Sequence, residues 1–117
     1  MLKIYHNPRC SKSRETLQLI EEKGADVTVV EYLKDVPTPA ELTELVRLLG
    51  ISPLELVRKG EAVYKEQYKG KEMSDEEWIL AMVEEPKLIE RPIIVKGNKA
   101  VLGRPPQNVL ELLLKKD

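Results

Sequence analysis

The only cysteine of this 117-residue chain, Cys10, lies four residues after its only histidine, His6. Both belong to the segment YHNPRCSKSR (residues 5–14), which also contains Arg9 and Arg14. Thiolates are the nucleophilic form of cysteine, and nearby cations or a helix N-terminus lower the pKa of a thiol. If a strand ends near His6 and a helix follows, the segment predicts an activated thiolate at the mouth of that helix.

Each of the two residues has an ordinary structural interpretation. A lone cysteine is more often a small buried apolar residue, and a lone histidine is more often a surface group. Only their joint placement in one strand-to-helix turn, with the hydroxyls of Ser11 and Ser13 as further donors, brings the catalytic interpretation level with the structural one.

Ser13 completes a C-x-x-S pattern, in which a serine stands where a dithiol enzyme keeps its resolving cysteine. One cysteine forms neither an internal disulfide nor a cysteine-rich zinc site, so no metal is predicted. Any redox chemistry at Cys10 must therefore take its second sulfur from another molecule. The backbone N–H groups at the helix mouth would suit an incoming oxyanion.

Three arginines lie at the edges of predicted elements: Arg58, Arg91 and Arg104. Arg58 follows a short helix, and each of the other two precedes a proline. The planar fork of arginine matches tetrahedral oxyanions, so three of them around one thiolate would form a phosphate-like binding site. Most arginines are solvated surface groups, however, and spacing alone does not show that these converge.

The elements that would position these residues alternate along the chain. Apolar alternation predicts a strand at 2–6, and helical spacing closed by Gly24 predicts a helix at 11–23. β-Branched and aromatic residues predict a second strand at 27–33. Further signals are helix starts at Thr38, Ser52 and Ser74, two strands within 91–103 that turn at Gly97-Asn98, and a last helix opened by Pro105.

This order, β-α-β, a helical block and β-β-α, predicts an α/β chain whose mixed sheet has about four strands. It is the layout of a thioredoxin-like fold with a helical insertion at about residues 38–90. The length fits one domain over residues 1–117.

Composition excludes other classes. Apolar residues make up 42% and charged residues 33%, which is typical of a folded globular chain. The formal charge is −1 and the charges are mixed, so no nucleic-acid partner is predicted. Because no apolar run approaches the roughly 18 residues of a membrane span and no signal peptide is visible, we expect no membrane partner and a cytoplasmic protein. We also expect a monomer.

Four segments together resemble the arsenate reductase (ArsC) family of the glutaredoxin-coupled type: HNPRCSKSR, LVRKGEAVYKE, ERPIIV and GRPP, in this order along nearly the whole chain. The resemblance implies a thioredoxin-like fold with a helical insertion. It also implies a catalytic role for Cys10, a role for His6 in lowering the pKa of that thiol, and a cis Pro92 beside the site. The oxyanion-binding residues that it implies are Arg58, Arg91 and Arg104.

The implied substrate is arsenate or a similar oxyanion. No bound cofactor is expected, glutathione is the implied co-substrate, and glutaredoxin is the implied protein partner. The turn reads CSKSR where well-characterised members have CGTSR, and this is similar to the chromosomal branch of the family. Ser11 and Lys12 are thereby candidate substrate-binding residues, although the added charge of Lys12 and Arg9 would either tighten anion binding or crowd the pocket.

Two other functions stay open. One is a monothiol oxidoreductase that acts on another oxidant or on glutathionylated protein. The other is a non-enzymatic regulator that resembles the Spx group, which shares this fold and binds RNA polymerase. Because Ser13 replaces the second cysteine of that group while all three arginine positions are kept, the sequence favours an enzyme.

Overall fold

The computed structural model describes residues 2–114, which form two compact units. The sheet unit comprises the chain up to Asp35 together with the chain from Arg91 onward, and the helical unit comprises Val36–Glu90. The helical unit is thus inserted in the chain between two parts of the sheet unit. Each unit is described separately below.

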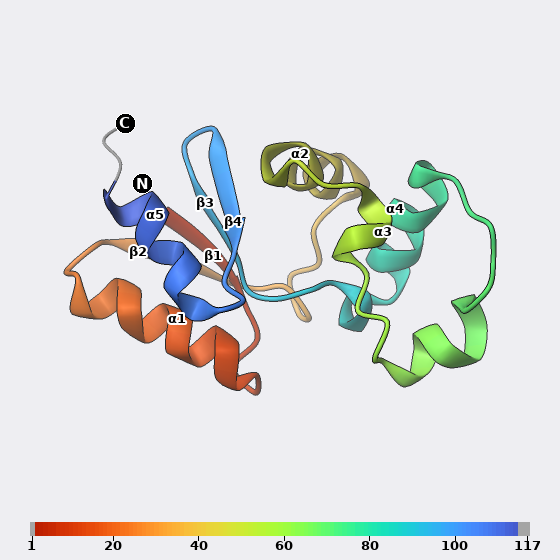
Figure 1. Cartoon of the computed structure of the whole chain (residues 1–117), viewed down its shortest axis with the longest axis horizontal. Coiled ribbons are helices and arrows are strands. Elements are labelled where there is room, and N and C mark those ends of the chain that lie inside the picture. Colours follow the sequence, from red (N-terminus) through yellow and green to blue (C-terminus); the bar gives the residue numbers. More distant parts are fainter. Residues whose placement is uncertain (1, 115–117) are drawn as a thin grey trace. The chain divides into compact units, whose positions relative to one another are not determined.

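The sheet unit contains one four-stranded sheet of order β2-β1-β3-β4 (Figure 1). Its strands are β1 (Leu2–His6), β2 (Val27–Glu31), β3 (Ile93–Lys96) and β4 (Lys99–Leu102). β2 runs parallel to β1, whereas β3 is antiparallel to both β1 and β4. The predicted α/β architecture with a mixed sheet of about four strands is therefore confirmed.

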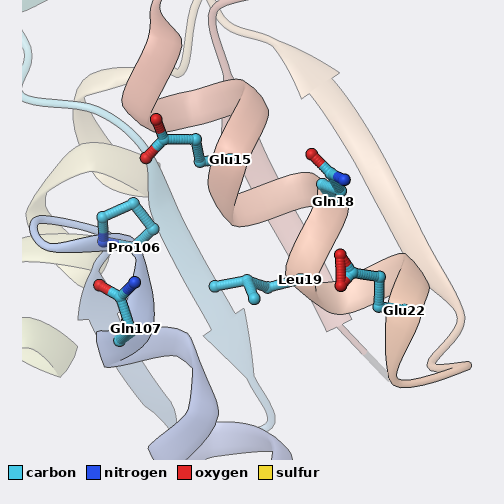
Figure 2. Close-up of a pocket in the computed structure, with 6 residues that line it drawn as sticks. All are labelled: Glu15, Gln18, Leu19, Glu22, Pro106 and Gln107. Carbon is cyan, nitrogen blue, oxygen red and sulfur yellow. The ribbon is translucent and has the colours of Figure 1, made fainter.

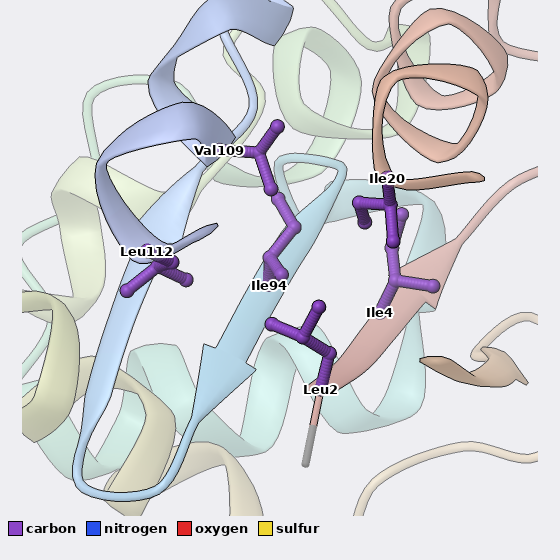
Figure 3. Close-up of a cluster of buried hydrophobic side chains, with 6 residues drawn as sticks. All are labelled: Leu2, Ile4, Ile20, Ile94, Val109 and Leu112. Atoms are coloured by element: carbon purple, nitrogen blue, oxygen red, sulfur yellow. The ribbon is translucent and has the colours of Figure 1, made fainter. Parts of the chain in front are cut away.

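Two helices of the sheet unit, α1 (Ser11–Glu22) and α5 (Val109–Leu114), cover one face of the sheet. Between helices and sheet lies a core of buried side chains (Figure 3), namely Leu2, Ile4, Ile20, Ile94, Val109 and Leu112. Burying one such aliphatic side chain contributes about 1.5–3 kcal/mol. The core therefore holds α1 against β1, and with it the turn that joins them.

The turn between β1 and α1 is closed by the side chain and backbone of Asn7. The Asn7 carbonyl accepts from the Cys10 N–H at 3.0 Å, and Asn7 Oδ1 accepts from the Arg9 N–H at 3.0 Å. Cys10 has extended backbone angles and is the N-cap residue of α1. Because Pro8 has no N–H for a strand partner and Asn-Pro favours a turn, the chain leaves β1 and enters the helix within four residues.

The helical unit contains α2 (Pro39–Leu49), α3 (Pro53–Leu56), α4 (Asp75–Glu84), a π-helix η1 (Tyr64–Tyr68) and a 3₁₀ turn η2 (Pro86–Leu88). Its helices begin one residue after the predicted caps Thr38, Ser52 and Ser74. At Thr38 and Ser74 the hydroxyl accepts from the backbone N–H of the glutamate three residues later. The carboxylate of that glutamate in turn accepts from the backbone N–H of the capping residue. Such reciprocal caps are local interactions, so the sequence predicts them well.

Two boundaries and one element differ from the sequence predictions. β2 ends at Glu31 rather than at residue 33, because the Glu31 carbonyl accepts from the N–H groups of Lys34 and Asp35 and turns the chain. The π-helix η1 was not predicted; its two tyrosine rings lie against Trp78. The last α-helix begins at Val109 rather than near Pro105, because a 3₁₀ turn, η3 (Pro106–Asn108), precedes it.

Gly103, directly after β4, fits against the site segment so closely that a side chain would collide. A Cβ placed there would lie 2.6 Å from Thr16 Oγ1 and 2.7 Å from Pro92 Cγ. We predict that Gly103→Ala lowers the free energy of unfolding by about 1–3 kcal/mol, as overpacking does elsewhere. Urea denaturation measures the free energy of unfolding. Gly60→Ala is the matched control, because a Cβ added at Gly60 has no other atom within 4 Å. Equal midpoints for the two variants would contradict the prediction.

Candidate active site

Cys10 is buried at the N-terminus of α1, with 8% of its surface exposed. Its carbonyl accepts the first helical hydrogen bond, from the Arg14 N–H at 3.0 Å. The Cys10 side chain makes no complete capping hydrogen bond, but the N–H groups of Ser13 and Lys12 lie close enough to favour its anion. The sulfur thus occupies the position at which a helix stabilises negative charge.

Two arginines of the sheet unit reach the sulfur. Arg104 Nη2 donates to Cys10 Sγ at 3.4 Å, and Arg104 Nε donates to the Arg91 carbonyl at 2.7 Å. The Arg91 guanidinium also forms a hydrogen bond to Cys10. The peptide bonds Arg91–Pro92 and Arg104–Pro105 are both cis, the first of them in agreement with the sequence prediction.

Strand pairing explains how the two arginines converge. In the β3–β4 hairpin Ile93 lies opposite Leu102, so the residues just before β3 and just after β4 leave the sheet at the same end. Ile93 also lies opposite Tyr5, so this end coincides with the carboxyl end of β1, from which the chain turns into Cys10. The sheet register therefore brings Arg91 and Arg104, 13 residues apart in sequence, to one sulfur.

The pKa of the Cys10 thiol is lowered from its ordinary value by these neighbours. Burial is the largest single influence and raises the pKa, because it disfavours the charged form. The Ser13 N–H, the hydrogen bond and charge of Arg91, and the Lys12 N–H lower it and together prevail. The geometry consequently favours the thiolate, which is the nucleophilic form.

His6 contacts Ser13 rather than the sulfur. Its Nδ1 lies 2.6 Å from Ser13 Oγ, and the Asn7 N–H donates to the same oxygen at 3.0 Å. Burial lowers the pKa of His6, an effect that the Glu31 charge opposes and the Arg14 charge reinforces. His6 is therefore linked to Cys10 through Ser13, and a direct effect of an imidazolium on the thiol stays a prediction.

The remaining cations of the turn are exposed. Arg14 Nη1 donates to the Pro8 carbonyl at 3.0 Å, and Lys12 Nζ lies 3.9 Å from Glu15. Arg9 and Ser11 are also exposed. None of these side chains fills the space between Cys10 and Arg104, because that contact is direct. Substrate binding by Ser11 and Lys12 stays a prediction.

Arg58 belongs to the helical unit. An antiparallel bridge between Val57 and Ile89 fixes its backbone, and the Arg58 N–H donates to the Leu88 carbonyl at 2.6 Å. Its guanidinium pairs with Glu90, with Nη1 at 3.0 Å from Oε1. The guanidinium of Arg58 is therefore held in place by a carboxylate within its own unit, and its predicted role in oxyanion binding stays a prediction.

A separate pocket of about 230 Å³ lies on the sheet unit between α1 and η3 (Figure 2). It is lined by Glu15, Gln18, Leu19, Glu22, Pro106 and Gln107. Cys10 and the two arginines near its sulfur do not line it, so we do not assign the reaction to this pocket.

Within residues 2–114, no group of three or more histidine, cysteine or acidic side chains is placed to hold a metal ion. No helix in the same range has the length and apolar character needed to cross a membrane.

Sequence reasoning missed Asn7 and Gly103. Asn7 closes the turn and supplies an N–H to Ser13, and the Asn-Pro breaker was its only sequence signal. Gly103 permits close approach to Pro92 and donates its N–H to the Pro92 carbonyl at 2.9 Å. A glycine before an arginine gives no such indication in sequence, because the approach depends on the hairpin.

The fold and the site define a thioredoxin-like α/β protein with a single cysteine at the mouth of its first helix and arginines beside the sulfur. The ArsC family matches residues 5–112, and the chain belongs to this family. It is 51% identical to the uncharacterised protein YfgD of Escherichia coli (strain K12) over 114 residues, covering 96% of each chain.

Other relatives carry a functional name. The chain is 43% identical to an arsenate reductase of Haemophilus influenzae over 112 residues, which is 94% of this chain and 97% of the relative. The solved structure of an arsenate reductase from Vibrio cholerae superposes with a TM-score of 0.90 at 47% identity, covering 94% of this chain and 95% of the other. Fold and family are thus established by independent comparisons.

The contacts of Arg91 make its effect on the thiol measurable. We predict that Arg91→Gln raises the pKa of Cys10 by about one unit, so that alkylation below that pKa slows about tenfold. Arg91→Lys keeps the positive charge but loses the forked guanidinium. The pKa of Cys10 in this variant should therefore lie between its values in the unmodified protein and in Arg91→Gln. The rate of iodoacetamide alkylation against pH gives the pKa, and Lys23→Gln, at the far end of α1, is the control. An unchanged pKa in Arg91→Gln would contradict the assignment.

Proposed function

We propose that this protein reduces arsenate to arsenite, with the Cys10 thiolate as nucleophile and with glutathione and glutaredoxin as the source of electrons. One observation carries the proposal, namely the 3.4 Å contact between Arg104 Nη2 and Cys10 Sγ beside a second guanidinium, that of Arg91. A nucleophile surrounded by forked cationic donors suits a tetrahedral oxyanion better than it suits a neutral substrate. Relatives named arsenate reductase support the choice of arsenate.

The first step follows from the positions of the charges. The Cys10 thiolate attacks arsenic, a sulfur–arsenic bond forms, and one arsenic–oxygen bond breaks as the oxygen leaves as water after protonation. Arg91 and Arg104 offset the negative charge that develops on the remaining oxygens. Before attack, the backbone N–H groups of Ser13 and Lys12 stabilise the thiolate by donating hydrogen bonds toward it.

The electrons for reduction come from two outside thiols. Glutathione displaces a second oxygen and forms a bond to arsenic. A glutaredoxin thiolate then attacks the glutathione sulfur, so the electron pair of that arsenic–sulfur bond remains on arsenic, which becomes arsenic(III). Hydrolysis of the last sulfur–arsenic bond releases arsenite and restores Cys10. In balance, arsenate and two thiols give arsenite, one disulfide and water.

The need for outside thiols is supported by the composition of the site. Cys10 is the only cysteine, and Ser13 stands in the sequence where a C-x-x-C enzyme has its resolving cysteine. A supply of reduced glutathione is typical of the cytoplasm, where we place the protein, and the proposed cycle needs one copy of the chain. No bound cofactor and no nucleic acid enter this scheme.

Arg58 is the third arginine that we propose to bind the oxyanion. Its support is the resemblance carried by LVRKGEAVYKE, together with a guanidinium that Glu90 holds in one position. Its Nε is buried and makes no hydrogen bond to any described residue.

We predict that Cys10→Ser abolishes arsenate reduction, because no other thiol of the chain replaces the nucleophile. The assay supplies arsenate, glutathione and glutaredoxin and follows NADPH oxidation through glutathione reductase. Lys23→Gln is the control and should keep full activity. Turnover of glutathione mixed disulfides with none of arsenate would instead identify a monothiol oxidoreductase.

We also predict that multiple turnover stops when glutathione is omitted, even with a dithiol reductant such as thioredoxin present. The reason is that the adduct on Cys10 has no neighbouring thiol to resolve it. Release of arsenite over many cycles with thioredoxin alone would contradict this and would indicate direct attack by the outside dithiol.

A further inference from the structure

Asn108 holds the segment that leads from β4 to the arginine at the sulfur. Its side-chain amide donates to two main-chain carbonyls of that segment: Nδ2 lies 3.1 Å from the carbonyl oxygen of Leu102 and 3.2 Å from that of Arg104. An amide NH₂ group has two hydrogens, one for each of these carbonyls. Both donors of the Asn108 side chain are therefore directed at the chain that carries Arg104.

The position of Asn108 is itself fixed by the core of the sheet unit. Asn108 is the last residue of η3 and directly precedes Val109, the first residue of α5. Val109 is completely buried and belongs to the same core as Ile4 and Ile20 (Figure 3). The Asn108 N–H also donates to the Pro105 carbonyl at 3.0 Å. The amide thus reaches the segment before it from a rigid base.

Arg104 connects this segment to the nucleophile. Its guanidinium donates through Nη2 to Cys10 Sγ at 3.4 Å and through Nε to the Arg91 carbonyl at 2.7 Å. A guanidinium is a planar fork of fixed geometry, so it makes both contacts only while its main chain stays in place. A continuous series of contacts consequently runs from Val109 in the core through Asn108 and Arg104 to the sulfur.

We propose that Asn108 is a positioning residue for the nucleophile: its amide fixes the main chain of Arg104, so that the guanidinium of Arg104 meets the Cys10 thiolate. The inference deepens the proposed function and rests on Cys10 as the reacting group with Arg104 beside it. It gives the 3₁₀ turn η3 a part in the chemistry.

The two carbonyls require N–H donors at position 108, and two substitutions separate this requirement from side-chain size. Leucine is branched at Cγ as asparagine is and fills a similar space, but it has no donor. Alanine lacks both the donors and the volume. If the hydrogen bonds to Leu102 and Arg104 are what matters, Asn108→Leu and Asn108→Ala should affect the sulfur alike.

The test measures the pKa of Cys10 in both variants from the rate of iodoacetamide alkylation against pH. The chain has one cysteine, so the rate reports a single group. We expect the pKa to rise by about half a unit, so that alkylation below the pKa slows about threefold. Gln107→Ala is the matched control and should leave the pKa unchanged, because the Gln107 amide is exposed and lines the separate pocket (Figure 2).

A double-mutant cycle with Arg104→Gln distinguishes positioning from a general loss of structure. If Asn108 acts through the guanidinium of Arg104, Asn108→Leu should produce no further rise in the pKa of Cys10 once that guanidinium is absent. The urea midpoint of each variant shows that it is folded under the conditions of alkylation. Asn108→Leu carries the test alone if Asn108→Ala does not fold.

Three results would overturn the proposal. The first is an unchanged or lowered pKa of Cys10 in the folded Asn108 variants. The second is the same rise in the Arg104→Gln background, since the effect would then not pass through Arg104. The third is a rise in only one of the two folded variants, which would assign the effect to side-chain size. Because alkylation requires no arsenate, failure of the chain to reduce arsenate would leave this test intact.

Discussion

The site depends on the stabilisation of negative charge on the buried Cys10 sulfur by neighbouring N–H and guanidinium groups. Desolvation disfavours the Cys10 thiolate, and N–H groups and guanidinium groups that replace the lost water lower the pKa of the thiol despite this burial. α1 supplies the first kind of donor and the hairpin β3–β4 supplies the second. The core between α1, α5 and the sheet keeps both in register, which connects the packing of side chains such as Ile4 and Ile20 to the chemistry of one sulfur.

The parts of the structure that local interactions determine were predictable from sequence. The caps at Thr38 and Ser74 and the helix mouth at Cys10 depend on residues within a few positions of one another. Two features were not predictable. The end of β2 at Glu31 depends on turn hydrogen bonds to its carbonyl, and the π-helix η1 packs its tyrosine rings against the distant Trp78. Convergence of Arg91 and Arg104 depends on strand register, which spacing alone did not show.

Ser13 shows what is gained when a resolving thiol is absent. Its hydroxyl is completely buried and contacts both the His6 ring and the Asn7 N–H, so it joins the strand end, the turn and the helix. A thiol is a weak donor and acceptor and would hold these groups less firmly. The protein thus has a polar link in place of a second redox centre, and this is consistent with electrons that arrive from outside.

The hydrogen bond from Arg104 to the Arg91 carbonyl couples the positions of the two arginines. Arg104 donates through Nε to the backbone that carries Arg91 and through Nη2 to the sulfur, so the same side chain braces a peptide and touches the nucleophile. Free energies of substitution at groups that share a partner do not add. Loss of Arg104 would therefore displace the chain that presents Arg91, and the energetic worth of either guanidinium has meaning only for the pair.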